Sequence, residues 1–199
     1  MTQQDLIENS KDLCITAEEV LTKTGLVEIF SKLGKIEIIG SLRLKLMYRR
    51  DIDLFVLSNS IEKNKVYEIT KELIDKDIFQ TIGLADYQTY PAHDMPLGFF
   101  WELIIPHEGK NWKFDVWYLK PDEKYTHLVH NSINKFESLL KASPKKAETV
   151  LKIKEAYFDG IKYKNGVKSF DIYTAVLEQG INSIQEFNAT VKKNYIIPS

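Results

Sequence analysis

Hydrophobic positions along the first 90 residues follow two different periods, which separate helices from strands. Apolar residues three or four positions apart indicate a helix with one buried face, and short apolar runs indicate buried strands. Gly25 and Gly34 mark a break and an end in the first helical stretch. The predicted elements are a helix over residues 11–33, strands over 35–40 and 51–57, a helix over 61–76 and an irregular strand over 79–90.

Two further apolar runs, GFFWELIIP and NWKFDVWYL, are separated only by the turn-like residues 107–110. This arrangement predicts a β-hairpin. In a symmetric hairpin the numbers of facing residues add to 217, which places Glu102 across from Asp115. Like charges in facing positions repel each other, so this pair points to a bound cation or to a catalytic proton. An ion pair of Glu102 with Arg43 or Arg50 would relieve the same repulsion and stays open as an alternative.

After Pro121 the pattern changes to helical spacing alone. A boundary near Lys120 therefore divides the chain into an α/β core, residues 1–120, and a helical C-terminal region, residues 121–199. The expected fold class is α+β, with a mixed, twisted β-sheet flanked by helices. The stretches with helical spacing in the second part are 122–140, 144–158, 169–179 and 184–193.

Residues 36–57 carry the most distinctive chemistry. An apolar run ends at Gly40-Ser41, a basic segment follows, and a second run opens with Asp51 and Asp53, one residue apart. Because side chains alternate along a strand, the two carboxylates share one face. Such a pair is costly to bury, and a divalent cation held by oxygen ligands, magnesium or manganese, relieves the repulsion. The alternative is an aspartate pair at a strand entry that caps a turn without metal.

A Gly-Ser bend after a strand, followed about ten residues later by Asp-x-Asp, resembles the signature of the DNA polymerase β-like nucleotidyltransferase superfamily. Asp115, in the run WKFDVWYL, matches the third carboxylate that this family carries on a later strand. The resemblance covers about residues 25–120 and is to small bacterial members similar to the antibiotic nucleotidyltransferases. The sequence departs from many of them because the loop lacks a second glycine, and Arg50 precedes the first aspartate.

The resemblance implies transfer of a nucleoside monophosphate from a nucleoside triphosphate to a hydroxyl group, with release of pyrophosphate. Asp51, Asp53 and Asp115 would hold Mg²⁺ or Mn²⁺, which lowers the pKa of the attacking hydroxyl and stabilises the leaving group. Asp115 would also help to deprotonate the acceptor. Glu102 is a further candidate for the catalytic base.

The same resemblance implies where the nucleotide, ATP or another nucleoside triphosphate, would bind. Gly40 lets the backbone approach a phosphate group because it has no Cβ, and the Ser41 hydroxyl would donate to phosphate oxygens. Arg43 and Arg50 are candidates to add positive charge at the phosphates. Lys45 and Arg49 belong to the same basic segment, and the sequence does not show which of the four point inward.

Composition narrows the expected partners. The formal net charge of −1 lacks the excess of basic residues that long nucleic acids require, so a small-molecule or protein acceptor is expected. No apolar run approaches the ~20 residues of a membrane span, and the polar N-terminus is unlike a signal peptide, so a cytoplasmic protein without membrane contact is expected. The single cysteine, Cys14, excludes an internal disulfide and is expected to be buried.

A second function class stays open: a non-catalytic interaction protein with the same fold, such as the antitoxin of a toxin pair. The missing loop glycine and Arg50 beside Asp51 favour that hypothesis, whereas the complete set of three carboxylates favours an enzyme. His127 and His130, three residues apart on a predicted helix, have a spacing that can bind zinc, but the sequence offers no second pair of ligands nearby.

Overall fold

The structure, a computed structural model, describes residues 3–159 and 166–194. Its five strands form one mixed sheet in the order β1-β2-β5-β4-β3, in which β2 and β5 are parallel and the other neighbours are antiparallel. The strands are β1 (Lys35–Ile39), β2 (Asp51–Leu57), β3 (Thr81–Asp86), β4 (Gly98–His107) and β5 (Lys110–Leu119). The predicted α+β class with a mixed sheet is confirmed.

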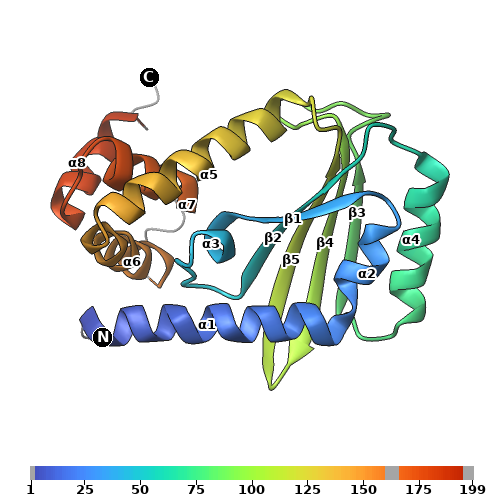
Figure 1. Ribbon diagram of the computed structural model, residues 1–199, viewed down its shortest axis with the longest axis horizontal. Coiled ribbons are helices and arrows are strands. Elements are labelled where there is room, and N and C mark those ends of the chain that lie inside the picture. The colour runs from blue at the N-terminus through green and yellow to red at the C-terminus, as the bar shows by residue number, and fades with distance from the viewer. Residues whose placement is uncertain (1–2, 160–165, 195–199) are drawn as a thin grey trace.

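Helices cover both faces of this sheet (Figure 1). The helices of the first part are α1 (Gln3–Thr24), α2 (Leu26–Ser31), α3 (Gly40–Arg43) and α4 (Lys63–Asp75). The second part adds α5 (Lys124–Ala142), α6 (Lys145–Phe158), α7 (Ser169–Tyr173), a π-helix (Thr174–Glu178) and α8 (Ile184–Asn194). Figure 1 shows α6, α7 and α8 gathered at the end of the molecule opposite α4, with α5 leading to them from the sheet.

Two hydrophobic cores lie on opposite faces of the sheet. Alternate strand residues, such as Ile52, Leu54 and Val56 of β2, pack against α1, α2 and α4 in the first core. Phe55, which points the other way, belongs to a second core with residues of α5, α6, α7 and the π-helix. The alternation along β2 therefore places Asp51 and Asp53 on the face toward the C-terminal helices.

Several sequence predictions about elements are confirmed. Gly25 separates α1 from α2 with a φ of +66°, and Cys14 is buried. The hairpin has the predicted register, with Glu102 paired to Asp115. The predicted strand over residues 79–90 was too long, because β3 ends at Asp86, whose carboxylate accepts a hydrogen bond from the Thr89 amide and stabilises a turn.

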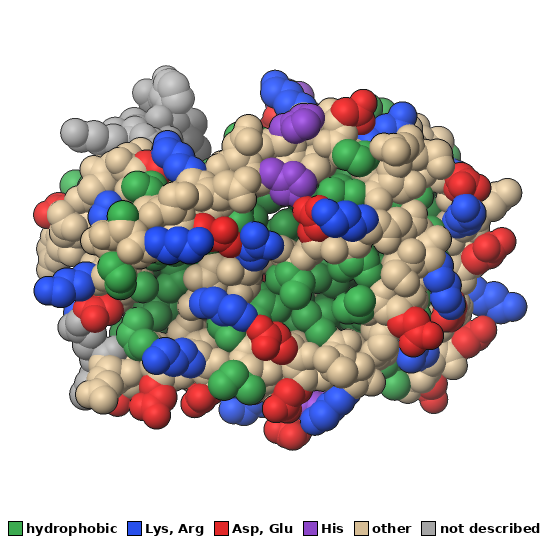
Figure 2. All heavy atoms as spheres, in the orientation of Figure 1, with side chains coloured by type: hydrophobic (Ala, Val, Ile, Leu, Met, Phe, Trp, Pro, Cys, Tyr) green, Lys and Arg blue, Asp and Glu red, His purple; other side chains and the backbone are tan. Residues whose placement is uncertain are grey.

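The outer edge of β1 is visible between α1 and α5 in Figure 2. Hydrophobic side chains gather there in a hollow, and a cavity of about 670 Å³ beside β1 is lined by residues that include Ile36, Ile38 and Leu42. Charged side chains of both signs are scattered over the rest of this face, with no large patch of one sign (Figure 2). No helix in the described part of the chain is long and apolar enough to cross a membrane.

Candidate functional site

Four carboxylates meet on one face of the three central strands. Asp53 of β2 is paired in register with Asp115 of β5, and Asp115 is paired with Glu102 of β4. Asp51 lies two residues before Asp53 and therefore on the same face. Neighbouring strands lie about 4.8 Å apart, so the sheet itself holds these side chains together.

The ammonium group of Lys113 lies among these carboxylates. Its Nζ is 2.7 Å from Asp115, 3.7 Å from Glu102 and 3.9 Å from Asp51. Glu102 is thus paired with Lys113. The alternative prediction, an ion pair of Glu102 with Arg43 or Arg50, is wrong. Lys113 is paired with Asp51 in the parallel register and shares the face of Asp115, which is why it reaches the carboxylates.

Asp53 is packed beneath the bend that follows β1. Gly40 adopts a φ of +64°, and a Cβ at this position would overlap the Asp53 carboxylate. Burial, followed by the negative charges of Asp115 and Asp51, raises the pKa of Asp53 to about 7. Burial likewise raises the pKa of Asp115, although Lys113 opposes the shift.

The carboxylates offer a donor set that fits divalent cations. Oδ1 of Asp115 is buried without a hydrogen-bond partner, and an oxygen of this kind can still serve as a ligand. Hard, oxygen-only ligands suit Mg²⁺ or Mn²⁺. Among the described residues no group of three or more His, Cys, Asp or Glu side chains is already gathered as a metal site, and Lys113 lies among the carboxylates instead. A cation bound here would compete with Lys113 for Asp115 Oδ2, whereas Oδ1 of the same carboxylate is free of hydrogen bonds.

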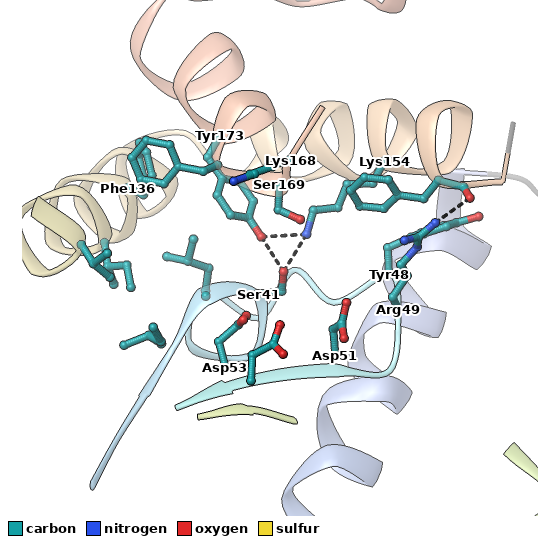
Figure 3. A pocket seen from close by; sticks show the side chains of 18 of the residues that line it. Ser41, Tyr48, Arg49, Asp51, Asp53, Phe136, Lys154, Lys168, Ser169 and Tyr173 are labelled. Carbon is teal, nitrogen blue, oxygen red and sulfur yellow. Dashed lines mark hydrogen bonds between the residues drawn. The ribbon is translucent and has the colours of Figure 1, made fainter. Parts of the chain in front are cut away.

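A second polar group lies directly above the carboxylates (Figure 3). Lys154 of α6 is 1% exposed, and its Nζ donates to Ser41 Oγ at 3.0 Å, to Tyr173 Oη at 2.7 Å and to the Leu46 carbonyl at 2.6 Å. The hydroxyl oxygens of Ser41 and Tyr173 are also hydrogen-bonded to each other, at 2.9 Å. Burial lowers the pKa of Lys154 to about 7, against the charge of Asp53, which acts to raise it. Binding of an anion at this point would favour the charged lysine.

A cavity of about 320 Å³ connects the two groups. Its floor includes Asp51, Asp53 and Asp115, and Ser41 and Lys154 line it as well. Figure 3 shows Ser41 between the carboxylates and the helices, with its hydroxyl toward Lys154 and Tyr173. The more apolar part of the wall comes from the C-terminal helices and consists of Tyr125, Val129, Ile133, Phe136 and Phe170. The cavity therefore joins a carboxylate floor, a cationic donor and an apolar wall.

The described fold is similar to that of Cid1 poly(U) polymerase with Mg and 3′-dATP bound, at a TM-score of 0.58 and 12% identity over 88% of this chain. It is also similar to a cytoplasmic RNA terminal U-transferase, at a TM-score of 0.53 and 13% identity over 87% of this chain. A third similar structure is the non-canonical poly(A) polymerase GLD-2 in complex with GLD-3, at a TM-score of 0.55 and 10% identity over 92% of this chain. The chain has the nucleotidyltransferase fold.

These neighbours are polymerases of the DNA polymerase β-like nucleotidyltransferase superfamily. The chain spans only 55%, 53% and 59% of their respective lengths. No protein-family model matches the sequence, and no curated protein matches it either. The likeness to small bacterial antibiotic nucleotidyltransferases therefore stays a prediction.

Two of the predicted nucleotide-binding residues do not line the cavity of this nucleotidyltransferase fold. Arg43 Nε lies 2.6 Å from Glu137 of α5, and the residue lines the hollow beside β1 instead. Arg50 lines a separate depression near the hairpin turn with His107 and Lys110. Arg49 does line the cavity, and it donates to the Phe158 carbonyl at 2.8 Å.

Sequence reasoning missed the residues that the C-terminal region contributes. Lys154 lies in a helical pattern whose other inward positions are apolar, and this lysine on a buried face was the available signal. Tyr173 gave no comparable signal, because a tyrosine in an apolar helix is ordinary. Of the two helical histidines, His130 lies 2.7 Å from Glu37 of β1.

Proposed function

We propose that this chain is a metal-dependent nucleotidyltransferase that moves a nucleoside monophosphate from a nucleoside triphosphate to a hydroxyl group. The observation that supports it most is the in-register meeting of Asp53 and Asp115, with Asp51 beside them, at the floor of a cavity. Its wall also carries a buried lysine, and the fold is that of known nucleotidyltransferases. Carboxylates and a cationic donor facing one cavity are the groups that phosphoryl chemistry needs.

In this proposal Asp51, Asp53 and Asp115 would hold Mg²⁺ or Mn²⁺. Bound there, the ions would lower the pKa of the attacking hydroxyl and neutralise charge on the leaving pyrophosphate. Asp115 lies toward the acceptor side and receives the hydroxyl proton, directly or with Glu102, its cross-strand neighbour. The acceptor oxygen forms a bond to the α-phosphorus while the bond to pyrophosphate breaks.

Ser41 and Lys154 bind the phosphate groups in this arrangement. The Ser41 hydroxyl and the Lys154 ammonium are 3.0 Å apart and both line the cavity. A phosphate group could accept from Ser41 and replace Ser41 or Tyr173 as an acceptor of Lys154. Gly40 leaves the backbone open to the same group because no Cβ stands in the way. The apolar wall formed by Phe136 and Phe170 would take the nucleobase.

ATP is the donor that we propose to test first. One similar structure holds 3′-dATP and another is a poly(A) polymerase. The acceptor that we propose is a small molecule or a protein, because the chain has a net charge of −1 and lacks the excess of basic residues that long nucleic acids require. In the described part of the chain the carboxylates and the cavity occur together, which supports an enzyme over the non-catalytic alternative.

The test is a transfer assay with each of the four α-labelled nucleoside triphosphates, Mg²⁺ and a panel of alcohols, amino sugars, proteins and RNA. We expect pyrophosphate release and label on an acceptor, reduced about 10³-fold in Asp53→Asn and Asp115→Asn because several kcal/mol of charge stabilisation is lost. Lys65→Met, an exposed residue outside the cavity that pairs with Glu62, serves as a control and should keep most of the activity. Turnover that survives both aspartate substitutions would refute the proposal.

A further inference from the structure

A row of aromatic side chains leads out of the cavity along the face that carries the carboxylates. Tyr125 lines the cavity, and its ring centroid is 6.1 Å from that of Trp117 on β5. Trp117 in turn lies 4.7 Å from Phe100 on β4 and is stacked on Tyr87 at 5.7 Å. These four residues, Tyr87, Phe100, Trp117 and Tyr125, are called the aromatic row below.

The register of the sheet places this row one step from the carboxylates. Trp117 follows Asp115 by two residues, and Phe100 precedes Glu102 by two, so each aromatic side chain shares a face with its acidic neighbour. Phe100 and Trp117 are paired across the strands, as Glu102 and Asp115 are. Two residues along a strand span about 7 Å, which is the scale of one sugar or aromatic ring.

The C-terminal helices reach Trp117 through Tyr125 of α5 but do not extend over β3 and β4 on this face. The core that they form takes in residues of β1, β2 and β5 but none of β3 or β4 in the described part of the chain. Trp117 is partly exposed, whereas Trp101 and Trp112, which complete the set of three tryptophans, are buried. A molecule on the aromatic row would thus rest against the open face of β3 and β4 and reach Asp115.

The charge of the same face disfavours a polyanion. The open faces of β2, β5 and β4 carry four carboxylates, Asp51, Asp53, Glu102 and Asp115, and a single ammonium, Lys113. No basic residue stands on the open faces of β3 and β4 in the register of the sheet. Their side chains there are those of Thr81, Gly83, Ala85, Phe100, Glu102 and Ile104. A phosphodiester strand crossing these strands would meet no cation, although phosphate contacts with basic residues supply most of nucleic-acid affinity.

We propose that the aromatic row is the acceptor site, and that the acceptor is a ring-bearing alcohol without negative charge. This inference rests on the proposed function, because it needs Asp115 to face the reacting hydroxyl. One face of the ring packs on Trp117 and Phe100, and a hydroxyl reaches toward Asp115 and the cavity. A positive group on the acceptor is attracted by the aromatic faces and by Glu102 alike.

Trp117 supplies a direct reporter of binding that requires no turnover, because it is the accessible tryptophan. The experiment measures acrylamide quenching of tryptophan fluorescence in the full chain with Mg²⁺ and a non-hydrolysable ATP analogue. Three probes of matched length are compared: a glucosamine trisaccharide, maltotriose and a uridine trinucleotide. We expect the two sugars to reduce quenching at least twofold at saturation, the cationic one at lower concentration, and the trinucleotide to leave it unchanged.

Substitutions in the aromatic row test whether the protection from quenching comes from binding there. Trp117→Phe should remove the protected signal while keeping the fold, and Phe100→Ala should raise the half-saturating sugar concentration about tenfold. Tyr90→Ala is the matched control, because Tyr90 is 73% exposed and makes no ring contact with the row. Circular dichroism melts of each variant show whether a loss of binding reflects unfolding, and Phe100→Leu repeats the test with a smaller change in volume.

Each other result overturns the inference. Protection by the trinucleotide in preference to both sugars would make the row a nucleic-acid site. Protection by the ATP analogue alone would make it the nucleobase site. Protection by no probe up to 10 millimolar, or an unchanged response in Phe100→Ala and Phe100→Leu, would mean that the row binds no acceptor. Failure of the proposed function would appear separately, as absent pyrophosphate release with sugar binding intact.

Discussion

Lys113 Nζ lies 2.7 Å from Asp115 Oδ2, while the other oxygen of that carboxylate, Oδ1, is buried without a hydrogen-bond partner. One lysine thus balances part of the negative charge that Asp51, Glu102 and Asp115 bring together, and one ligand position stays available. Lys113 is therefore an internal counter-ion of these carboxylates, and in the proposed function divalent ions would take over that role.

Replacing Lys113 by methionine should make the fold more dependent on metal. Without the ammonium, Asp51, Glu102 and Asp115 repel one another, and we expect a loss of about 1 kcal/mol, or about 2–4 °C in melting temperature, without Mg²⁺. Added Mg²⁺ should restore this loss and stabilise the variant more than the wild type. Thermal melts with EDTA and with Mg²⁺ measure both effects. Lys65→Met, which breaks an exposed pair with Glu62, is the control and should show no dependence on Mg²⁺.

The raised pKa of Asp53 predicts how stability depends on pH without metal. Its pKa is about 7 in the folded chain and 3.8 as the reference value, so between these values the folded state holds an extra proton. Stability should therefore fall as pH rises from about 4 to 7, by up to about 4 kcal/mol, at about 1.4 kcal/mol per pH unit. Above pH 7 this contribution is constant.

Lys154 affects the stability of the fold at pH values above 7. Its pKa is lowered to about 7, so above pH 7 the unfolded state holds the extra proton and stability should rise with pH. Urea unfolding with EDTA at pH 5, 7 and 8.5 should thus show a minimum near pH 7. Asp53→Asn should remove most of the acidic slope and leave the part that comes from Asp115, whose pKa is also raised. Asp86→Asn, which affects an ion pair with Lys63 outside the site, should leave the whole slope. An unchanged slope in Asp53→Asn would contradict the assignment.

Gly40 and Gly109 form a matched pair for testing the approach of Asp53 to the bend. Both have positive φ, +64° and +72°, but a Cβ at Gly40 would overlap the Asp53 carboxylate whereas Gly109 has open space around it. Gly109→Ala should cost about 1–2 kcal/mol through backbone strain alone. Gly40→Ala should cost more and should also abolish metal-dependent turnover. Equal losses of stability with intact turnover in both would show that the bend does not position Asp53.

Lys154→Met tests the phosphate-binding role of the buried lysine. Removing the donor to Ser41 should raise the KM for ATP about 10- to 100-fold, because a charge-assisted hydrogen bond of 1.5–3 kcal/mol is lost. Stability should also fall, by about 1–3 kcal/mol, because the Leu46 carbonyl, Ser41 and Tyr173 lose their buried donor. Steady-state kinetics and melts measure the two. Lys152→Met, on the same helix but partly exposed, should leave KM unchanged. A large fall in kcat at constant KM would contradict this role.

Much of the α/β part could be predicted from the sequence because its signals are local. The hairpin register follows from the short turn, and it fixes Glu102 against Asp115. The Asp-x-Asp spacing fixes two carboxylates on one face of β2. The parallel pairing that brings Asp53 to Asp115 is not local, and the sequence did not predict it. Only the family resemblance connected Asp115 with Asp51 and Asp53, as a third carboxylate.

The remaining features of the site depend on contacts between distant segments. Lys154 donates a hydrogen bond to Ser41, which lies 113 residues earlier in the sequence, and the hydrophobic pattern of α6 does not predict that contact. The sequence did not show which way the four basic side chains before β2 point. In the structure Arg43 forms an ion pair with Glu137, and Arg50 lines a separate depression. Lys113 was overlooked because a lysine in a strand ordinarily faces solvent.

The central claim is that Asp51, Asp53 and Asp115 jointly hold divalent ions beside a nucleotide. The most direct measurement is a Mn²⁺ titration followed by electron paramagnetic resonance, with a non-hydrolysable ATP analogue present. The claim predicts two nucleotide-dependent Mn²⁺ ions per chain in the wild type and at most one in Asp53→Asn and in Asp115→Asn. Binding that is absent in the wild type, or unchanged in both variants, would contradict it.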